Sequence, residues 1–167
     1  MEIKSDVILD HTQIQHIIRR IAYQIYESNP DESEVLLAGI YENGYVFAGK
    51  IKKVLEKISP LQVRLCKVTM DKKQPINSVT SEIAPEDFQN KSIVVIDDVL
   101  HSGSTLIYGV NFFLQAPLKR IKTVVLIDRS HKQFPVKADF KGISLSTSLN
   151  ESVKVIFEKN NDRAVLE

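Results

Sequence analysis

The apolar positions of the chain predict helices in three regions. Near the amino terminus, apolar residues recur at intervals of three and four, the period of one helix face, and Asp10 or Thr12 can cap this helix. A second helical pattern follows Gly44, and a third spans Thr105 to Gln115. The apolar stripes of the first two helices are Ile14, Ile17, Ile18, Ile21, Ala22 and Ile25, and then Val46, Phe47, Ile51, Val54 and Leu55.

Short apolar runs between these helices predict strands. They lie at residues 34–40, 61–70, 92–96 and 121–128, with shorter ones near Ile143 and at 153–157. The run at 92–96 ends in two adjacent carboxylates, Asp97 and Asp98. Helices and strands alternate and the central strands are apolar on both faces, which predicts an α/β fold with a mostly parallel sheet covered by helices on both sides. At 167 residues, we expect one domain spanning 1–167.

Four polar connections follow the strands of this predicted sheet. They are residues 41–44, 70–91, 97–105 and 128–142. Ligands of such sheets bind beyond the carboxyl ends of the strands, so these loops are candidate site loops. The stretch 70–91 is long, polar and without periodicity, which is typical of a functional lid or hood over that edge of the sheet.

Composition and charge narrow the classes of function. The chain is 43% hydrophobic and 26% charged, as in ordinary globular proteins, and its net charge of +1 gives no overall attraction to nucleic acid or membrane. Cys66 is the only cysteine, which excludes a disulfide framework and a cysteine-based metal site. No run is long and apolar enough for a membrane span, and the segment MEIKSDVILD lacks the pattern of a signal peptide. We expect a cytoplasmic location.

The segment SIVVIDDVLHSGSTL, from Ser92 to Leu106, carries the clearest chemistry. Backbone N–H groups at a helix start lack partners within the helix, so a loop of small residues there can surround a phosphate, and Gly103 permits unusual backbone angles. Asp97 and Asp98 instead suit the hydroxyls of a vicinal diol, or a metal held through water. The segment therefore predicts a site for a ribose 5-phosphate.

Three other interpretations of the segment are weaker. Paired aspartates at a strand end also hold Mg²⁺ in response-regulator-type folds, but there they come early in the chain and no Ser-Gly-Ser-Thr loop follows. A P-loop requires Gly-Lys-Ser/Thr, which this segment lacks. A purely structural turn would rarely place two carboxylates side by side at the end of a strand.

The segment VVIDDVLHSGSTL resembles the phosphoribosyl pyrophosphate signature of type I phosphoribosyltransferases. Further segments resemble, in order along nearly the whole chain, the family of bifunctional pyrimidine-operon attenuation regulators with uracil phosphoribosyltransferase activity. They are VILDHTQIQHIIRRIAYQIYE, LLAGIYENGYVFA and VVLIDRSHKQFPVKADFKGISLSTSLNESVKV. The last of these, over residues 128–142, narrows the resemblance to this subfamily.

This resemblance implies a reaction in which a base, most simply uracil, displaces pyrophosphate from Mg²⁺-bound phosphoribosyl pyrophosphate to give a nucleotide such as UMP. Asp97 and Asp98 would hold the ribose diol and influence Mg²⁺ indirectly, and Lys72 and Lys73 would belong to the lid. The remaining implied roles are phosphoribosyl pyrophosphate binding by Val99, Leu100, His101, Ser102, Gly103, Ser104 and Thr105, a pyrophosphate loop of Tyr41, Glu42, Asn43 and Gly44, and base contacts by Arg129, Val136, Lys137 and Ala138.

The pyrophosphate loop departs from the family pattern. The subfamily usually has Thr-Arg-Gly where this chain has Glu42, Asn43 and Gly44. A carboxylate beside pyrophosphate is unfavourable unless it faces away or reaches Mg²⁺. The lid is shorter than in the resembled regulators, and Lys72 or Lys73 can replace the missing cation.

Two alternatives to uracil transfer stay open. One is a regulator that senses pyrimidine nucleotides and binds leader RNA with weak catalysis, using a face around Arg19 and Arg20; the other is an enzyme that uses a purine or another base. The family also implies a homodimer or a higher homo-oligomer. For His101, a role in loop geometry is favoured over a role as general base, and His11 and His16 are expected at the surface.

Overall fold

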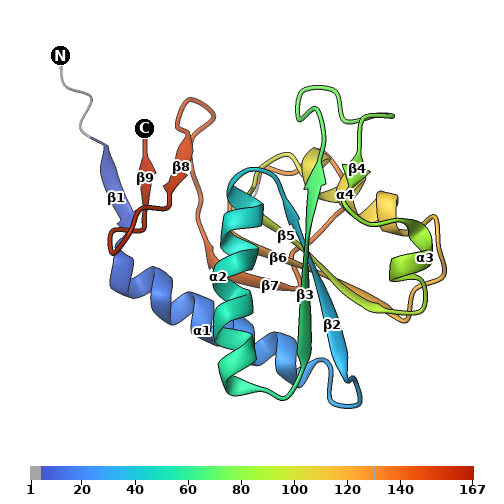
Figure 1. The fold of residues 1–167 in the computed structure, drawn as a ribbon. Helices are drawn as coiled ribbons and strands as arrows, with labels where there is room; N and C mark the ends of the chain where they lie inside the picture. The colour runs from blue at the N-terminus through green and yellow to red at the C-terminus, as the bar shows by residue number, and fades with distance from the viewer. Residues whose placement is uncertain (1–4, 130) are drawn as a thin grey trace.

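The computed structural model describes residues 5–129 and 131–167 and has a central six-stranded sheet with the order β4-β3-β2-β5-β6-β7 (Figure 1). Neighbouring strands are parallel except for β4, which is antiparallel to β3. This confirms the predicted mostly parallel sheet. The strands are β2 (Glu34–Ile40), β3 (Gln62–Thr69), β4 (Thr80–Ser81), β5 (Ser92–Leu100), β6 (Arg120–Asp128) and β7 (Phe140–Ser144).

Helices cover both faces of the sheet. Leu37 and Val94 pack toward α1 (His11–Glu27) and α2 (Asn43–Ile58), whereas their strand neighbours Leu36 and Val95 pack toward α3 (Pro85–Phe88) and α4 (Ser104–Phe113). Both sets are buried because successive side chains of a strand point to opposite faces. At the start of α1, Asp10 and Gln13 form a capping box, so the cap is Asp10.

A second, three-stranded sheet covers one end of the molecule. It consists of β1 (Asp6–Leu9), β9 (Arg163–Leu166) and β8 (Val153–Ile156), all antiparallel, and lies beside the amino-terminal ends of α1 and α2 (Figure 1). We call this sheet, together with the connections 145–152 and 157–162, the hood. The apolar pattern indicated β8 but neither β1 nor β9.

The polar stretch 70–91 is not devoid of regular structure. It contains β4 and the single-turn helix α3, whose Phe88 is fully buried and contacts Phe113 with a ring-centroid distance of 4.9 Å. These elements are too short to produce a periodic pattern in the sequence. They fasten the end of the stretch to the sheet and leave residues 71–79 as the part that can act as a lid.

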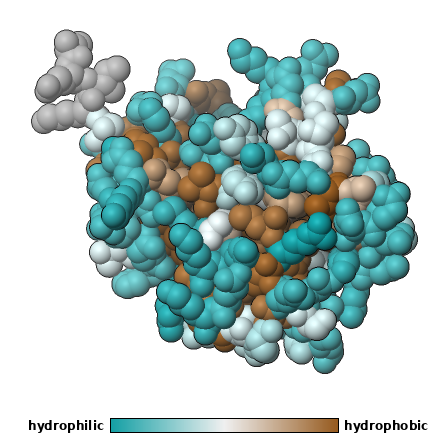
Figure 2. Space-filling model, viewed as in Figure 1, coloured by the Kyte–Doolittle hydropathy of each residue, from teal (hydrophilic) through white to brown (hydrophobic). Residues whose placement is uncertain are grey.

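On the face shown in Figure 2, hydrophilic side chains cover the periphery, and apolar surface emerges near the centre of the view. Among the described residues, no helix is long and apolar enough to cross a membrane.

Candidate active site

A topological switch point lies between the neighbouring strands β2 and β5. From β2 the chain continues to β3 on one side, and from β5 to β6 on the other, so the loops that follow β2 and β5 flank one crevice. The pairing of β2 with β5 ends at Gly39 and Ile96, whereas β5 remains paired with β6 as far as Leu100. The prediction that the strand ends before the aspartates was therefore wrong. Asp97 and Asp98 lie on the part of β5 that extends beyond its pairing with β2.

The two carboxylates of this extension have different surroundings. Asp97 is only 3% exposed, and its Oδ1 accepts a hydrogen bond of 2.9 Å from the backbone N–H of Asp98. Burial, and then the neighbouring Asp98 charge, raise the pKa of Asp97 well above its usual value, while Lys72 opposes this shift. The Lys72 Nζ lies 3.9 Å from Asp97 Oδ1, so the structure brings this lid residue to the site.

Asp98 is held from the side of α2. Its Oδ2 accepts a hydrogen bond of 3.1 Å from Asn43 Nδ2, which also donates to the carbonyl of Val155 at 2.9 Å. The sequence suggested that Asn43 and Gly44 are loop residues. The structure shows that they belong to the first turn of α2. Gly44 lies so close to β5 that an added Cβ would be 2.6 Å from the Ile96 carbonyl oxygen.

The rest of the expected pyrophosphate loop is exposed. The peptide bond between Tyr41 and Glu42 is cis, and the Glu42 side chain makes no capping hydrogen bond to α2. A cation that the sequence pattern did not reveal lies beside it. Lys67 Nζ is 5.1 Å from the ring centroid of Tyr41 and 5.2 Å from that of Tyr45, and it faces Glu82 at 4.0 Å.

The loop after β5 has the geometry of an anion site. Gly103 caps α4 with a φ of 88°, a left-handed conformation that favours glycine, and α4 begins at Ser104, one residue earlier than predicted. The first backbone N–H groups of this ten-residue helix are directed toward the loop. A cavity of about 60 Å³ is lined by Asp97, Val99, Leu100, His101, Ser102, Gly103, Thr105 and Leu106.

Larger hollows occur elsewhere on the described surface. One of about 340 Å³ lies between residues 76–79 and α4, and another of about 580 Å³ lies beside β3. Neither is lined by paired carboxylates or by a loop at a helix start. The chemistry of the lining residues, and not volume, therefore identifies the cleft at Asp97 as the candidate site.

The segment expected to face the base is divided by the structure. Val136 lies against the loop after β5, where its Cγ1 is 2.7 Å from the position that a Cβ on Gly103 would occupy. The backbone carbonyl of Lys137 instead accepts a hydrogen bond from Thr123, in the first half of β6, and its side chain is 81% exposed. Ala138 packs into the core on the α4 side. The structure thus places Val136 against the loop after β5, the Lys137 carbonyl on β6 and Ala138 against the core.

Arg129 is buried and bound to the hood. Its guanidinium donates to Thr147 Oγ1, at 2.9 Å from Nη2, and to the carbonyl of Glu151. The imidazole Nε2 of His131 lies 2.7 Å from the Thr147 carbonyl, so it is assigned as the protonated nitrogen. Partial burial, then Arg129, then His131 lower the pKa of His101, whose ring is 5.8 Å from that of His131. Thr147 was not predicted as a partner of Arg129, because nothing in its spacing along the chain links the two residues.

The residues expected to bind RNA are partly engaged in the fold. Arg20 donates from Nη2 to the carbonyl of Gly142 at 2.7 Å and from Nη1 to that of Lys141 at 3.0 Å, although its side chain is exposed. Arg19 lies over the ring of Tyr23 at 5.4 Å and is also exposed.

The carboxylate pair fits a substrate that carries Mg²⁺. Within the described residues, no group of three or more His, Cys, Asp or Glu side chains converges on a metal position. Asp97 pairs with Lys72, and Asp98 accepts a hydrogen bond from the carboxamide of Asn43. Such carboxylate oxygens suit Mg²⁺ in combination with substrate phosphates, held directly or through water.

Paired carboxylates on a strand extension, beside an anion loop at the switch point of a parallel sheet, define the class of phosphoribosyltransferases. In agreement, the family model described as "Phosphoribosyl transferase domain" matches residues 4–157, and the chain belongs to this family. Curated relatives named bifunctional protein PyrR support the resemblance to that subfamily. The relative from Macrococcus caseolyticus is 31% identical over 94% of both chains, and that from Clostridium acetobutylicum is 33% identical over 89% of this chain and 88% of its own.

Solved structures share the fold at low sequence identity. A hypoxanthine phosphoribosyltransferase from Trypanosoma cruzi superposes with a TM-score of 0.76 and 15% identity, covering 96% of this chain and 95% of its own. A hypoxanthine-guanine phosphoribosyltransferase from Bacillus anthracis gives a TM-score of 0.73 and 18% identity, covering 85% and 83%. At these identities the similarity concerns the fold and not the base that is used.

Proposed function

We propose that this protein transfers ribose 5-phosphate from phosphoribosyl pyrophosphate to uracil, giving UMP and pyrophosphate. The observation that carries the proposal is that one cavity is lined both by Asp97, of the carboxylate pair, and by the loop at the start of α4. A ligand with a vicinal diol close to a phosphate is complementary to this combination. Uracil is supported by the resemblance of residues 128–142 to the PyrR subfamily and by the PyrR relatives, of which two are 31% and 33% identical.

The side chains divide the substrate between them. The 5-phosphate accepts hydrogen bonds from the backbone N–H groups and hydroxyls of residues 101–105, while Asp97 and Asp98 accept hydrogen bonds from the 2- and 3-hydroxyls. The pyrophosphate lies toward residues 41–44, and Lys72 and Lys67 are the nearby cations. Mg²⁺, bound together with the substrate, supplies positive charge that neutralises the pyrophosphate.

The reaction is a substitution at the first carbon of the ribose. A ring nitrogen of the base forms the new bond as the bond to the pyrophosphate oxygen breaks, and the proton of that nitrogen leaves to solvent or to the departing group. The ribose carries positive charge in the transition state, as in glycoside cleavage. The two carboxylates stabilise that charge, because Asp97 is buried and Asp98 is held by Asn43 before the reaction begins.

Binding of leader RNA is a second candidate function. It is supported by the word "bifunctional" in the names of the relatives and by the exposure of Arg19. The contacts of Arg20 with the carbonyls of Lys141 and Gly142 favour a structural role for that residue. If RNA binds to this face, Arg19 carries more of the contact than Arg20.

Removal of the two carboxylate charges tests the proposed transfer. The variant Asp97→Asn/Asp98→Asn should lose transfer to uracil at saturating phosphoribosyl pyrophosphate, while its circular dichroism spectrum stays that of the wild type. The reason is that neutral carboxamides cannot stabilise a cationic ribose. Normal turnover by this double variant would show that the site lies elsewhere.

A further inference from the structure

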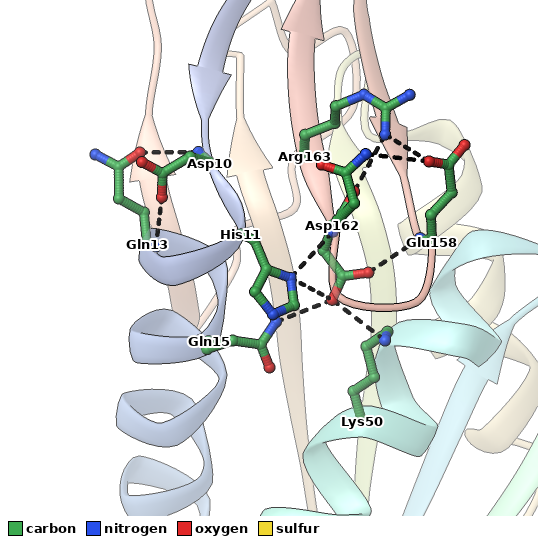
Figure 3. A network of polar contacts seen from close by, with 9 residues as sticks. Asp10, His11, Gln13, Gln15, Lys50, Glu158, Asp162 and Arg163 are labelled. Carbon is green, nitrogen blue, oxygen red and sulfur yellow. Dashed lines mark hydrogen bonds and ion pairs between the residues drawn. The ribbon is translucent and has the colours of Figure 1, made fainter.

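Asp162 is a buried charged residue with no role in the proposed reaction. It lies in the connection between β8 and β9 and is 1% exposed. Its Oδ2 accepts a hydrogen bond from Gln15 Nε2 at 2.9 Å and lies 3.2 Å from Lys50 Nζ (Figure 3). Its Oδ1 accepts from the backbone N–H of Glu158, and its own N–H donates to His11 Nδ1 at 3.1 Å. One carboxylate thus joins α1, α2 and the hood.

The same helix that holds Lys50 also carries Asn43. Residues 43, 47 and 50 lie on one face of α2, because intervals of four and seven residues return to nearly the same side of a helix. All three contact the hood. Asn43 donates to the Val155 carbonyl, Phe47 stacks on Phe157 with ring centroids 6.1 Å apart, and Lys50 Nζ lies 5.5 Å from the centroid of the Phe157 ring.

These contacts connect Asp162 to the paired carboxylates through a short series of residues. Asp162 fixes the turn that follows β8, and the carbonyl of Val155 in β8 binds the carboxamide that holds Asp98. A buried charge is costly unless it is paired, and such groups are retained in some proteins because they fix a single arrangement. We propose that Asp162 is a positioning residue, which sets the position of β8 over β5 and thereby the orientation of Asn43 and Asp98.

In the proposed function Asp98 binds the ribose hydroxyls and Asn43 lies on the pyrophosphate side, so Asp162 governs the binding of phosphoribosyl pyrophosphate more than that of the base. Residues 145–155 extend from the partners of Arg129 to the partner of Asn43, and β8 contacts β5. The loop at residues 101–105, which leads into α4, meets the hood indirectly: the His101 ring lies 5.8 Å from that of His131, whose Nε2 is 2.7 Å from the Thr147 carbonyl. This part of the inference rests on the proposed function, whereas the position of β8 does not.

The test uses Asp162→Asn in the full chain, with Glu56→Gln as the matched control. Both exchange a carboxylate for a carboxamide and remove an ion pair with a lysine of α2, but Glu56 lies on the solvent side, where it is 49% exposed and pairs with Lys52. We expect Asp162→Asn to accelerate amide hydrogen exchange of residues 153–156 about tenfold or more, through local opening of the hood, and Glu56→Gln to leave it unchanged.

In steady-state assays, Asp162→Asn should lower kcat/KM for phosphoribosyl pyrophosphate on the order of 10- to 100-fold, because Asp98 holds its ribose and small misplacements of site groups are costly, while KM for the base changes less than about threefold. Unchanged exchange in β8, or equal losses for base and sugar phosphate, would overturn the inference. Absence of transfer in the wild type would refute the proposed function, and hydrogen exchange would still decide the role of Asp162. If Asp162→Asn does not fold, Lys50→Met gives the same readouts with the carboxylate retained.

Discussion

The substitution Gly44→Ala adds one methyl group at the point where α2 touches the carboxylate strand. The new Cβ would lie 2.6 Å from the Ile96 carbonyl oxygen and 2.9 Å from Asp97 Cα, and both are backbone atoms of a central strand. Ordinary van der Waals contact begins at 3.4 Å, so the first turn of α2 must retreat by the difference, about 0.8 Å. Overpacking of this kind costs about 1–3 kcal/mol of unfolding free energy.

The effect on transfer should exceed the effect on stability. A displacement near 1 Å of groups that hold a reacting substrate can cost on the order of 100-fold in rate. We therefore expect kcat/KM for phosphoribosyl pyrophosphate to fall by about that factor, while the melting temperature falls by only several degrees, at about 2–4 °C per kcal/mol for a chain of this size.

Gly49→Ala provides the matched control for this prediction. It lies on the same helix, but its Cβ would meet only Leu65 Cδ2 at 3.8 Å, an ordinary contact. Alanine is the better helix former by about 1 kcal/mol, so this variant should keep its activity and melt at the same or a higher temperature. The assay is steady-state transfer together with calorimetric melting. If Gly44→Ala were as active as Gly49→Ala, the close approach of α2 to Asp97 would have no part in catalysis.

Three further predictions concern charge. The pKa of Asp97 is raised in the folded state, so its contribution to stability is full below the unfolded pKa of about 3.8 and is lost as the pH rises. Ligand-free Asp97→Asn should therefore melt at a higher temperature than wild type at pH 7–8, but at the same temperature near pH 3. A difference in melting temperature that does not change with pH would contradict this. Glu42→Arg should tighten phosphoribosyl pyrophosphate binding by on the order of 1 kcal/mol, and weaker binding in a calorimetric titration would mean that Glu42 engages Mg²⁺. Arg19→Ala should weaken any binding of pyrimidine-operon leader RNA in a mobility-shift titration, with a shallower salt dependence; an unchanged titration would exclude this face.

Much of the fold follows from local patterns in the sequence. The stripe on α1 and the apolar runs of β2, β5 and β6 reflect burial against two layers of helices, which period and length reveal directly. The anion loop was also predictable, because a helix start and a glycine with positive φ depend on neighbouring residues.

Contacts between distant residues were not predictable in this way. His11 was expected at the surface, yet its ring accepts a hydrogen bond from Asp162, which is 151 positions away. The sequence suggested that Asn43 is a loop residue. The structure shows instead that α2 begins at Asn43 and that the carboxamide of Asn43 donates to the Val155 carbonyl of β8. β1 and β9 were not predicted, and over four residues alternation alone does not reliably distinguish a strand from a loop, although the equally short β8 was predicted at 153–157.

A competition experiment tests the central proposal most directly. The purified protein is incubated with phosphoribosyl pyrophosphate, Mg²⁺ and equal concentrations of uracil, hypoxanthine and guanine, and the nucleotides are quantified by chromatography. The proposed function predicts that UMP forms, that its formation releases one equivalent of pyrophosphate, and that Asp97→Asn/Asp98→Asn forms none. Formation of a purine nucleotide in place of UMP would contradict the assignment of uracil, and no nucleotide from any base would contradict the proposed transfer itself.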